Sequence, residues 1–304
     1  MKTLTKTALM LILLLAFTIT LSAQKSEMLF PKLTGPYLGQ KPPGLKPEIF
    51  ARGILPSSKY HTTPVFTPDG KEVYWKMQGR KTISMMKMEN GVWSTPSEIK
   101  LSLKLNDFRD PCISPDGKKI FFLSIGKLPY QKEEKENIWF AERKSDGWGE
   151  PQPLGEEINS HELHWQVSVA SNGNLYFTSR NSGIEDIYCS RYIKGEYQTP
   201  ERLSGNINTD KMCETTPYID PDEKYLIFFR WDFYQEGKKN LYISFRNKDG
   251  SWCTAKNIIN NYGVSPQVSH DKKYLFYLGP ENGVYWVSAS IIENLLKEAL
   301  KEDK

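Results

Sequence analysis

The stretch TPVFTPDGKEVYWK, residues 63–76, predicts two short strands joined by a tight turn. Pro68 presets its backbone angle, Asp69 can bond its own backbone and Gly70 accepts a positive φ, so the three together favour a turn. The flanking residues are rich in β-branched and aromatic types, which favour strands. Closely similar motifs recur at three later positions: DPCISPDGKKIFFL (110–123), TPYIDPDEKYLIFF (216–229) and SPQVSHDKKYLFYL (265–278). A hairpin that recurs at a long period predicts a repeat fold.

Four short strands recur in a fixed order around this hairpin. Strand A precedes the turn and strand B follows it, and two further strands, C and D, complete each unit, as at 83–85 and 96–99 in the first. The A strands begin at residues 64, 111, 167, 217 and 266. Four short strands in about 40–50 residues are the signature of a β-propeller blade. A β-sandwich is the alternative, but it would not reuse one turn in one register.

The fifth unit lacks a D strand of its own, because residues 289–301 have the periodicity of a helix. The apolar face of this helix contains Ile292, Leu295, Leu296, Ala299 and Leu300. The missing strand lies near the N-terminus, where KPEIF (46–50) matches TPSEI (95–99) and TPERL (199–203). An N-terminal strand in the last blade closes the ring and removes the open edge. The sequence therefore predicts an all-β, five-bladed propeller of four-stranded blades with a short C-terminal helix.

The N-terminus has the pattern of a signal peptide. Lys2 and Lys6 precede an apolar stretch from 8 to 21, and Ala23 offers a small residue for cleavage. This stretch is shorter than the ~20 residues of a membrane-spanning helix, although an uncleaved anchor is the alternative. The first cysteine, Cys112, lies far from the cleavage site, so a lipoprotein is not expected. We predict a periplasmic or secreted protein with a signal peptide at 1–23, an extended segment at 24–45, the propeller at 46–288 and a helix and tail at 289–304.

The charge balance excludes some partners. The chain has 40 Lys and Arg against 36 Asp and Glu, a net charge of +4, and removal of Lys2 and Lys6 with the signal peptide leaves 4 − 2 = +2. A nearly neutral chain with interspersed charges predicts no nucleic-acid partner and no anionic-membrane surface. No other apolar run is long enough to span a bilayer, so no membrane insertion is expected after cleavage, and we expect a monomer. Cys112, Cys189, Cys213 and Cys253 have no CxxC spacing, and the sequence leaves their pairing open.

The repeat resembles that of a known group of proteins. SPDGKKIFFLS, followed by NIWFAERKSDGWGEPQPL, resembles the PD40 (WD40-like) repeats of TolB-like β-propellers. PYLGQKPPGLKPEIFA and GVYWVSASIIENL look like one exported group of these proteins in Bacteroidota, and the resemblance covers roughly 36–293. It implies an exported propeller that often serves as a binding or scaffolding surface. TolB itself has an α/β domain before a six-bladed propeller, and this chain has neither feature.

Propeller geometry predicts which face of the ring carries the ligand site. The D–A and B–C loops share one face and are the longer loops here, so the ligand site is expected on that face around the mouth of the channel. The expected ligand-binding residues are His61, Arg109, His164, Trp165, Arg180, Glu214, Arg230 and Trp231. Trp can stack on a sugar or peptide, and Arg can hold a carboxylate in a bidentate fork. The alternative for each residue is an ion pair or hydrogen bond that seals neighbouring blades.

The function prediction is a non-enzymatic protein that binds or scaffolds a protein, peptide or glycan. The alternative is a glycan-active hydrolase or lyase of the five-bladed type, in which Asp110, Glu162 and Glu214 would be the catalytic acids. The motif HELH at 161–164 lacks the HExxH spacing of zinc proteases, so no metal and no cofactor is expected. His270 replaces a turn residue in the fifth unit and is expected to be exposed.

Overall fold

The computed structural model describes residues 30–55, 62–77, 81–101, 105–232, 239–260 and 262–302. Residues Leu33–Lys304 form one compact unit, and the predicted signal peptide lies outside the described residues. No helix in the described part of the chain is long and apolar enough to cross a membrane.

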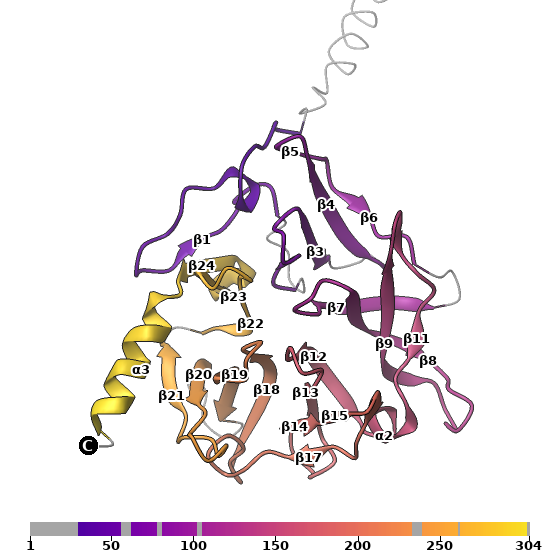
Figure 1. The fold of residues 1–304 in the computed structure, drawn as a ribbon, viewed down its shortest axis with the longest axis vertical. Coiled ribbons are helices and arrows are strands. Elements are labelled where there is room, and N and C mark those ends of the chain that lie inside the picture. Colours follow the sequence, from indigo (N-terminus) through magenta and orange to yellow (C-terminus); the bar gives the residue numbers. More distant parts are fainter. Residues whose placement is uncertain are drawn as a thin grey trace, which may run out of the picture. The chain divides into compact units, whose positions relative to one another are not determined.

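Five antiparallel sheets stand around a common axis (Figure 1). Blade one contains β2 (Val65–Phe66), β3 (Glu72–Lys76), β4 (Ile83–Glu89), β5 (Val92–Trp93) and β6 (Ser97–Glu98). Blade two contains β7 (Asn106–Ile113), β8 (Lys119–Gly126), β9 (Lys135–Lys144), β10 (Gly147–Trp148) and β11 (Gln152–Pro153). The short helix α2 (Glu156–Asn159) leads to blade three, which contains β12 (Leu163–Val169), β13 (Leu175–Ser179), β14 (Asp186–Ser190) and β17 (Glu201–Arg202), with a side hairpin of β15 (Tyr192–Ile193) and β16 (Glu196–Tyr197).

The last two blades complete the ring and confirm the predicted closure. Blade four contains β18 (Met212–Ile219), β19 (Tyr225–Asp232), β20 (Lys239–Phe245) and β21 (Lys256–Ile259). Blade five contains β22 (Val264–Val268), β23 (Tyr274–Leu278), β24 (Val284–Ser288) and the N-terminal strand β1 (Glu48–Ile49). Glu48 lies opposite Trp286 and Ile49 opposite Tyr285, so β1 is the outermost strand of the last blade, as the sequence predicts. Two 3-10 turns, η1 (Tyr37–Gly39) and η2 (Pro280–Asn282), complete the described elements before the C-terminal helix.

The recurring turn is held by its own side chains. In blade one, the Asp69 carboxylate accepts hydrogen bonds from the Thr67 hydroxyl at 2.7 Å and from the Lys71 amide at 3.0 Å. Gly70 has φ +67, which its missing Cβ permits. Ser114 and Asp116 repeat the arrangement in blade two, with 2.6 Å between hydroxyl and carboxylate. The repeated turn motif therefore fixes the A–B turns and, through them, the register in which strands A and B of each blade pair.

Apolar clusters lie between consecutive blades. One cluster joins blades one and two, another joins two and three, a third joins three and four, and the fourth joins four and five. The helix α3 (Ser290–Glu302) packs against the last cluster through Ile291, Ile292 and Leu295. Leu296 was expected on the packed face, but 39% of it is exposed, because the buried face of the helix is rotated toward Ile291.

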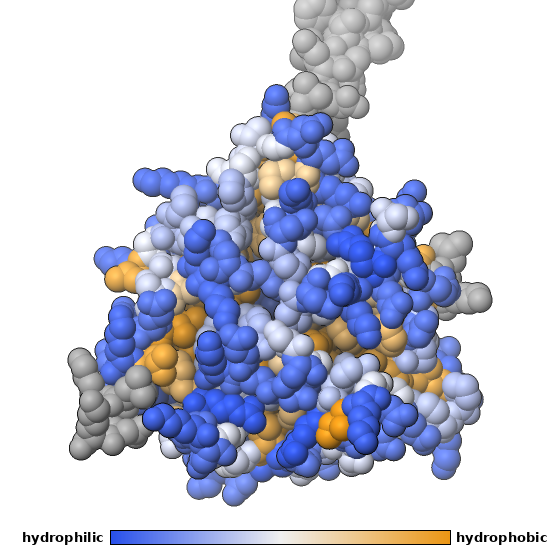
Figure 2. All heavy atoms as spheres, viewed as in Figure 1, coloured by the Kyte–Doolittle hydropathy of each residue, from blue (hydrophilic) through white to orange (hydrophobic). Residues whose placement is uncertain are grey.

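Hydrophilic residues cover most of the face seen in Figure 2, with smaller apolar areas between them. The exposed large apolar residues lie on separate elements and include Leu45, Trp165, Ile193 and Leu296. All four cysteines are free thiols, which answers the question that their spacing left open.

Candidate functional site

One residue in or just before the innermost strand of each blade has the same position relative to the A–B turn. The first turn residue of each blade is Thr67, Ser114, Ala170, Asp220 or Ser269, and its amide bonds the carbonyl at the start of strand B. Counting back four positions from these gives Thr63, Asp110, Gln166, Thr216 and Ser265. We call these five residues the axial ring.

A β-bulge sets the backbone at this level. In β7, two residues lie between the pairs Arg109–Leu123 and Cys112–Phe121, where the partner strand has one. The strands β18 and β22 carry the same single insertion. Asp110, Thr216 and Ser265 accordingly have φ of +47°, +49° and +56°. Such a bulge bends a strand and re-aims its side chains.

Blade three departs from this pattern by one further residue. Three residues, 164–166, lie between the pairs Leu163–Ser179 and Val167–Phe177, opposite a single residue of β13. The additional residue pushes Trp165 outward, with φ +63° and 54% of its surface exposed. The next residue, Gln166, turns inward and is only 2% exposed.

The Gln166 side chain fills the axis. Its Nε2 donates to the carbonyl of Pro266 at 2.9 Å and to that of Pro217 at 3.2 Å, in blades five and four. Its Oε1 accepts from the Ser265 hydroxyl, and the Ser265 amide donates to Thr216 Oγ1 at 3.2 Å. Three of the five axial-ring residues are therefore linked to one another, and these bonds join blades three, four and five.

The other two axial-ring residues, from blades one and two, form no hydrogen bond with any residue that the structure describes. The Thr63 hydroxyl is buried, with 1% of the residue exposed, and makes no hydrogen bond. The carboxylate of Asp110 is partly accessible and makes no hydrogen bond or ion pair with any described residue. Burial raises the pKa of Asp110 to about 6, although Arg109 and Lys76 lower it.

The cations beside Asp110 are already paired. The Lys76 ammonium lies 2.8 Å from Asp107 Oδ1, and Arg109 Nε donates to Asp107 Oδ2 at 2.7 Å. Arg109 Nη1 also lies 3.5 Å from Glu136 Oε2. Burial and repulsion from Asp110 raise the pKa of Glu136 to about 7, against the effect of Arg109. Arg109 is therefore bound to carboxylates of its own chain.

Arg180 and Arg230 are engaged in the same way. Arg180 Nη2 lies 2.7 Å from Glu185 Oε1, and Nη1 lies 3.9 Å from Glu162 Oε1. Arg230 Nε donates to Glu214 Oε1 at 2.8 Å. The side chain of Glu214 is fully buried and also accepts hydrogen bonds from the amide and hydroxyl of Thr209. Each of these ion pairs joins residues of one blade, blade three for Arg180 and blade four for Arg230, so none of them links neighbouring blades.

The remaining predicted residues are scattered. Trp231 is partly buried, with the Lys239 ammonium 5.7 Å from its ring centre. His61 lies outside the described residues, and His164 is described only through its backbone in β12. His161 is buried against Ser179, with 3.2 Å between Nδ1 and Oγ. Among the described residues, no three His, Cys, Asp or Glu side chains gather in a way that could hold a metal ion.

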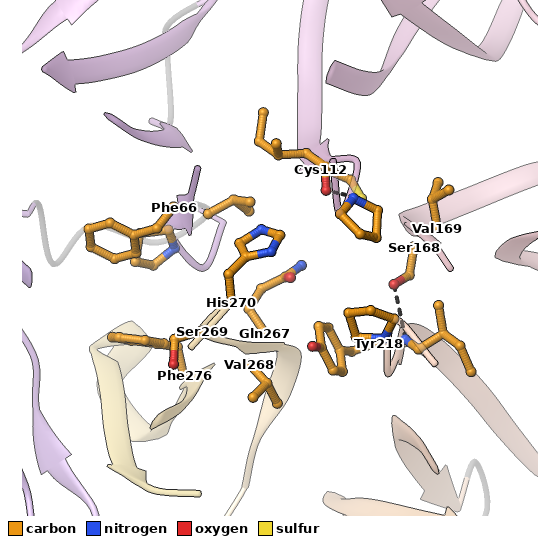
Figure 3. Close-up of a pocket in the computed structure, with 16 residues that line it drawn as sticks. Phe66, Cys112, Ser168, Val169, Tyr218, Gln267, Val268, Ser269, His270 and Phe276 are labelled. Carbon is orange, nitrogen blue, oxygen red and sulfur yellow. Dashed lines mark hydrogen bonds between the residues drawn. The ribbon is translucent and has the colours of Figure 1, made fainter. Parts of the chain in front are cut away.

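A small cavity lies on the axis at the other face, among the A–B turns (Figure 3). Its volume is about 30 Å³, enough for one or two water molecules. Figure 3 shows His270 and Gln267 pointing into it, with Cys112 and Tyr218 at its walls. His270 is therefore half-buried rather than exposed as expected, because the strand before it directs its ring toward the axis. Burial lowers its pKa.

Two buried asparagines were missed by the sequence analysis. Asn159 Oδ1 accepts from the Ile138 amide at 2.8 Å, and its Nδ2 donates to the carbonyls of Ile138 and Leu154. Asn208 makes the same three bonds one blade later, to Ile187 and Leu203. The signal was present as Leu-x-x-x-Ile-Asn, which occurs at 154–159 and again at 203–208.

Comparison with known proteins adds a likeness in fold. No protein-family model matches the chain, and no curated protein matches it. Similar solved structures include a putative TolB from Agrobacterium tumefaciens, with a TM-score of 0.49 and 18% identity over 72% of this chain and 69% of that one. TolB from Acinetobacter baumannii has a TM-score of 0.48 and 13% identity over 77% and 55% of the two chains. A gluconolactonase from Xanthomonas campestris has a TM-score of 0.48 and 10% identity over 84% and 96%. The similar structures thus include both TolB proteins and an enzyme, and at these TM-scores and identities they carry no argument about what this chain does.

Proposed function

We propose that this chain is an exported, non-enzymatic binding propeller whose ligand is a protein, peptide or glycan held around the axis on the D–A and B–C face. The single observation that carries this proposal is Trp165, an exposed indole in a strained insertion at the mouth of the axis.

The strain at Trp165 supports a binding role. A bulky side chain with positive φ costs on the order of 1–2 kcal/mol, and such strain is concentrated at functional sites. Within the described part of the chain, the indole makes no hydrogen bond or ring contact that would repay this cost. Five of the other tryptophans are buried, at 9% exposure or less: Trp75, Trp93, Trp139, Trp252 and Trp286. An exposed indole is suited to stacking on a ligand.

The surroundings of the acids favour binding over hydrolysis. A glycosidase needs two accessible carboxyl groups on either side of the scissile bond. The side chain of Glu214 is fully buried under Arg230 and Thr209, and Glu162 is exposed beside Arg180. Asp110 is the remaining member of the proposed catalytic set, and the acids beside it, Asp107 and Glu136, are bound to Arg109.

A quenching experiment tests the role of Trp165. Trp165 is the most exposed indole among the described residues, so acrylamide should quench it most strongly. Glycans, peptidoglycan fragments and short peptides would be screened for protection from quenching and for a rise in melting temperature. A ligand at ~100 times its dissociation constant stabilises the fold by about 2.7 kcal/mol, which shifts the melting temperature by a few degrees.

The variant Trp165→Ala should abolish both effects for any ligand that binds at the mouth. Ile193→Ala is the matched control, because Ile193 is 47% exposed on the β15–β16 side hairpin of the same blade. Ligand binding that survives Trp165→Ala unchanged would contradict the proposed site.

A further inference from the structure

We infer that the axial cavity among the A–B turns binds the hydroxymethyl group of a neutral sugar, between Gln267 and His270. This second site lies on the face opposite to the D–A loops, so the inference goes beyond the proposed function and does not depend on it.

Equivalent residues of the five blades form this cavity. Two positions before the first turn residue, each A strand contributes one residue to the lining: Val65, Cys112, Ser168, Tyr218 and Gln267. One position after the first turn residue, blades one, two and four have proline, at Pro68, Pro115 and Pro221, and blade five has His270. Figure 3 shows Gln267 and His270 both pointing into the cavity. Blade five thus brings an amide and an imidazole to the same cavity.

The Gln267 amide lacks a partner in the described part of the chain. Only 9% of the residue is exposed, and no described residue forms a hydrogen bond with its side chain. The five A–B turns around the cavity are all described, so none of them supplies a bond that is left out. Unlike the sealed Thr63 hydroxyl, this amide keeps some accessible surface. A nearly buried amide without a partner costs free energy, so a ligand that bonds to it would bind favourably.

His270 offers an acceptor in the same cavity. Burial lowers the pKa of His270 from its ordinary value of 6.5, although Asp271 and the carbonyl of Phe66 counteract part of this shift. The imidazole is therefore neutral at pH 7, and the carbonyl of Phe66 assigns the N–H to the ring nitrogen that faces it. The other ring nitrogen can then accept a hydrogen bond. A hydroxyl group both donates and accepts, so one hydroxyl can donate to His270 and accept from Gln267.

The lining selects a small, neutral group. None of the 16 described residues that line the cavity is an Asp, Glu, Lys or Arg. An ion would lose its hydration here without gaining a counter-charge, which disfavours a carboxylate or an ammonium. The volume of about 30 Å³ holds one or two water-sized groups, which matches a hydroxyl oxygen and the carbon that carries it. The remainder of the ligand would lie outside, over the A–B turns.

The rim of the cavity favours a sugar over a peptide. Of the exposed large apolar residues in the described part of the chain, none lies in an A–B turn. Protein and peptide interfaces depend on aromatic and apolar anchors, which this rim does not offer. The turns instead expose hydroxyl, amide and carboxylate groups, at Ser171, Asn172 and Asp222. Such groups can hydrogen-bond the remaining hydroxyls of a sugar.

Saturation-transfer NMR of the full chain with three methyl glycosides tests the inference. Methyl α-glucopyranoside carries a hydroxymethyl group, methyl α-xylopyranoside lacks it, and methyl α-glucuronide has a carboxylate in its place. We expect the glucoside to bind with a millimolar dissociation constant, because so small an anchor supports no tighter binding. Its hydroxymethyl protons should receive the strongest transfer. The xyloside and the glucuronide should not bind at the same concentration.

Two variants remove the anchors. Gln267→Leu keeps the volume and should weaken the affinity for the glucoside by about fivefold or more, because the sugar hydroxyl loses its donor. This variant should fold, since the amide bonds no described residue, and a thermal melt would verify it. His270→Pro introduces the residue that three other blades have at this position, and should weaken the affinity in the same way. Asp146→Asn is the control: it changes an exposed residue on the C–D turn of blade two and should leave the affinity for a neutral sugar within about twofold.

Several results would overturn the inference: no binding of the glucoside at tens of millimolar, equal binding of the xyloside, or an unchanged affinity in Gln267→Leu and His270→Pro. Binding of the seryl peptide acetyl-Gly-Ser-Gly-amide in place of the glucoside would also overturn it, because the hydroxymethyl group would then come from a peptide. Trp165→Ala separates this site from the proposed function, and should leave the affinity for the glucoside unchanged. Loss of glucoside binding in Trp165→Ala would place the sugar at the opposite face and remove the cavity as its site.

Discussion

At the scale of single residues, the buried carboxylates of this propeller differ in what surrounds them. Asp186 is fully buried and accepts two bonds from Arg202, at 2.6 and 3.0 Å. Glu214 is likewise buried and bonded to Arg230 and Thr209. Removal of one partner from such a pair strongly destabilises a protein, because the other charge is left buried and unpaired. Asp110 stands apart, since burial raises its pKa and no described residue forms a hydrogen bond with its carboxylate, so its removal should have the opposite effect.

This contrast predicts how stability depends on pH in Asp110→Asn. The folded pKa of Asp110 is about 6, above its ordinary value of 3.8, so the folded state binds this proton more tightly than the unfolded state. Its contribution to stability is fully present below pH 4 and is lost as the pH rises through 6. Asparagine does not titrate, so the free energy of unfolding of the variant relative to wild type should rise by roughly 1–3 kcal/mol between pH 4 and pH 7.

Urea unfolding at pH 4, 5.5 and 7 measures this difference. Removal of Asp110 also relieves its repulsion of Glu136, which acts in the same direction. A relative stability that is flat over this range, or that falls toward pH 7, would show that Asp110 is ionised without cost in the native ring.

At the scale of elements, the turns and strands could be predicted from the sequence, whereas the register between strands and the contacts between elements could not. The predicted D strands at 96–99, 151–154 and 200–203 contain the observed β6, β11 and β17. They could be predicted because turn chemistry and alternation are local properties. The inward turn of Gln166 and the exposure of Trp165 depend on the register of β12 against β13, which spacing alone does not reveal.

Hydrogen bonds and ion pairs between blades also occur at positions that the local sequence pattern did not predict. Arg143 of blade two bonds Glu72 of blade one at 2.6 Å and lies 4.0 Å from the ring centre of Trp148. Trp148 Nε1 in turn donates to the Tyr74 hydroxyl at 3.1 Å. Blades three and four are joined by the same residue types in a different arrangement: Arg246 of blade four lies 5.0 Å from the ring centre of Trp252 and donates to the Tyr176 hydroxyl of blade three at 3.4 Å, and that hydroxyl donates to Glu223 of blade four at 2.5 Å. The aromatic residue after the C–D turn therefore serves as a bridge to the preceding blade.

The buried asparagines give a prediction at this scale. Asn208→Ala leaves the amide of Ile187, a fully buried residue, without its partner and also removes the amide bonds to the carbonyls of Ile187 and Leu203, although the Ile187 carbonyl still accepts from the Leu203 amide. We expect a loss of about 1–3 kcal/mol in the free energy of unfolding, the cost of one unsatisfied buried group. Asn181→Ala is the matched control, since Asn181 is exposed, and it should change stability by about 0.5 kcal/mol or less. Equal effects of the two substitutions in chemical denaturation would contradict the role given to Asn208.

At the scale of the whole ring, closure depends on the segment from Leu33 to Phe50, and the sequence predicts the position of only part of it, the strand β1. The strand β1 could be predicted because its sequence repeats the D-strand motif of other blades. The segment before it has no such repeat, yet it ties two blades together. The Trp93 amide and indole of blade one donate to the carbonyls of Leu33 and Gly35, and η1 then carries Tyr37 toward blade five. Tertiary contacts of this kind leave no periodic trace in a sequence.

Tyr37 is the residue in this segment that tests ring closure. Its ring centre lies 5.1 Å from that of Phe66 in blade one and 5.0 Å from that of Tyr274 in blade five. Tyr37→Ala removes this wedge where the first and last blades meet, and should lower the free energy of unfolding by about 2–4 kcal/mol. Tyr37→Phe keeps the ring and loses only the hydroxyl contacts to Ser269 and Asp271, so its cost should stay near 1 kcal/mol.

Hydrogen exchange would locate the effect of Tyr37→Ala. If the segment from Leu33 to Phe50 holds the ring shut, exchange should rise first in β1, β24 and β2, the strands on either side of the seam, while blades three and four stay protected. A uniform rise over all five blades would instead mean that the ring opens everywhere at once and that closure is shared by every interface. A matching loss of stability in Tyr37→Phe would move the role from the aromatic wedge to the hydroxyl.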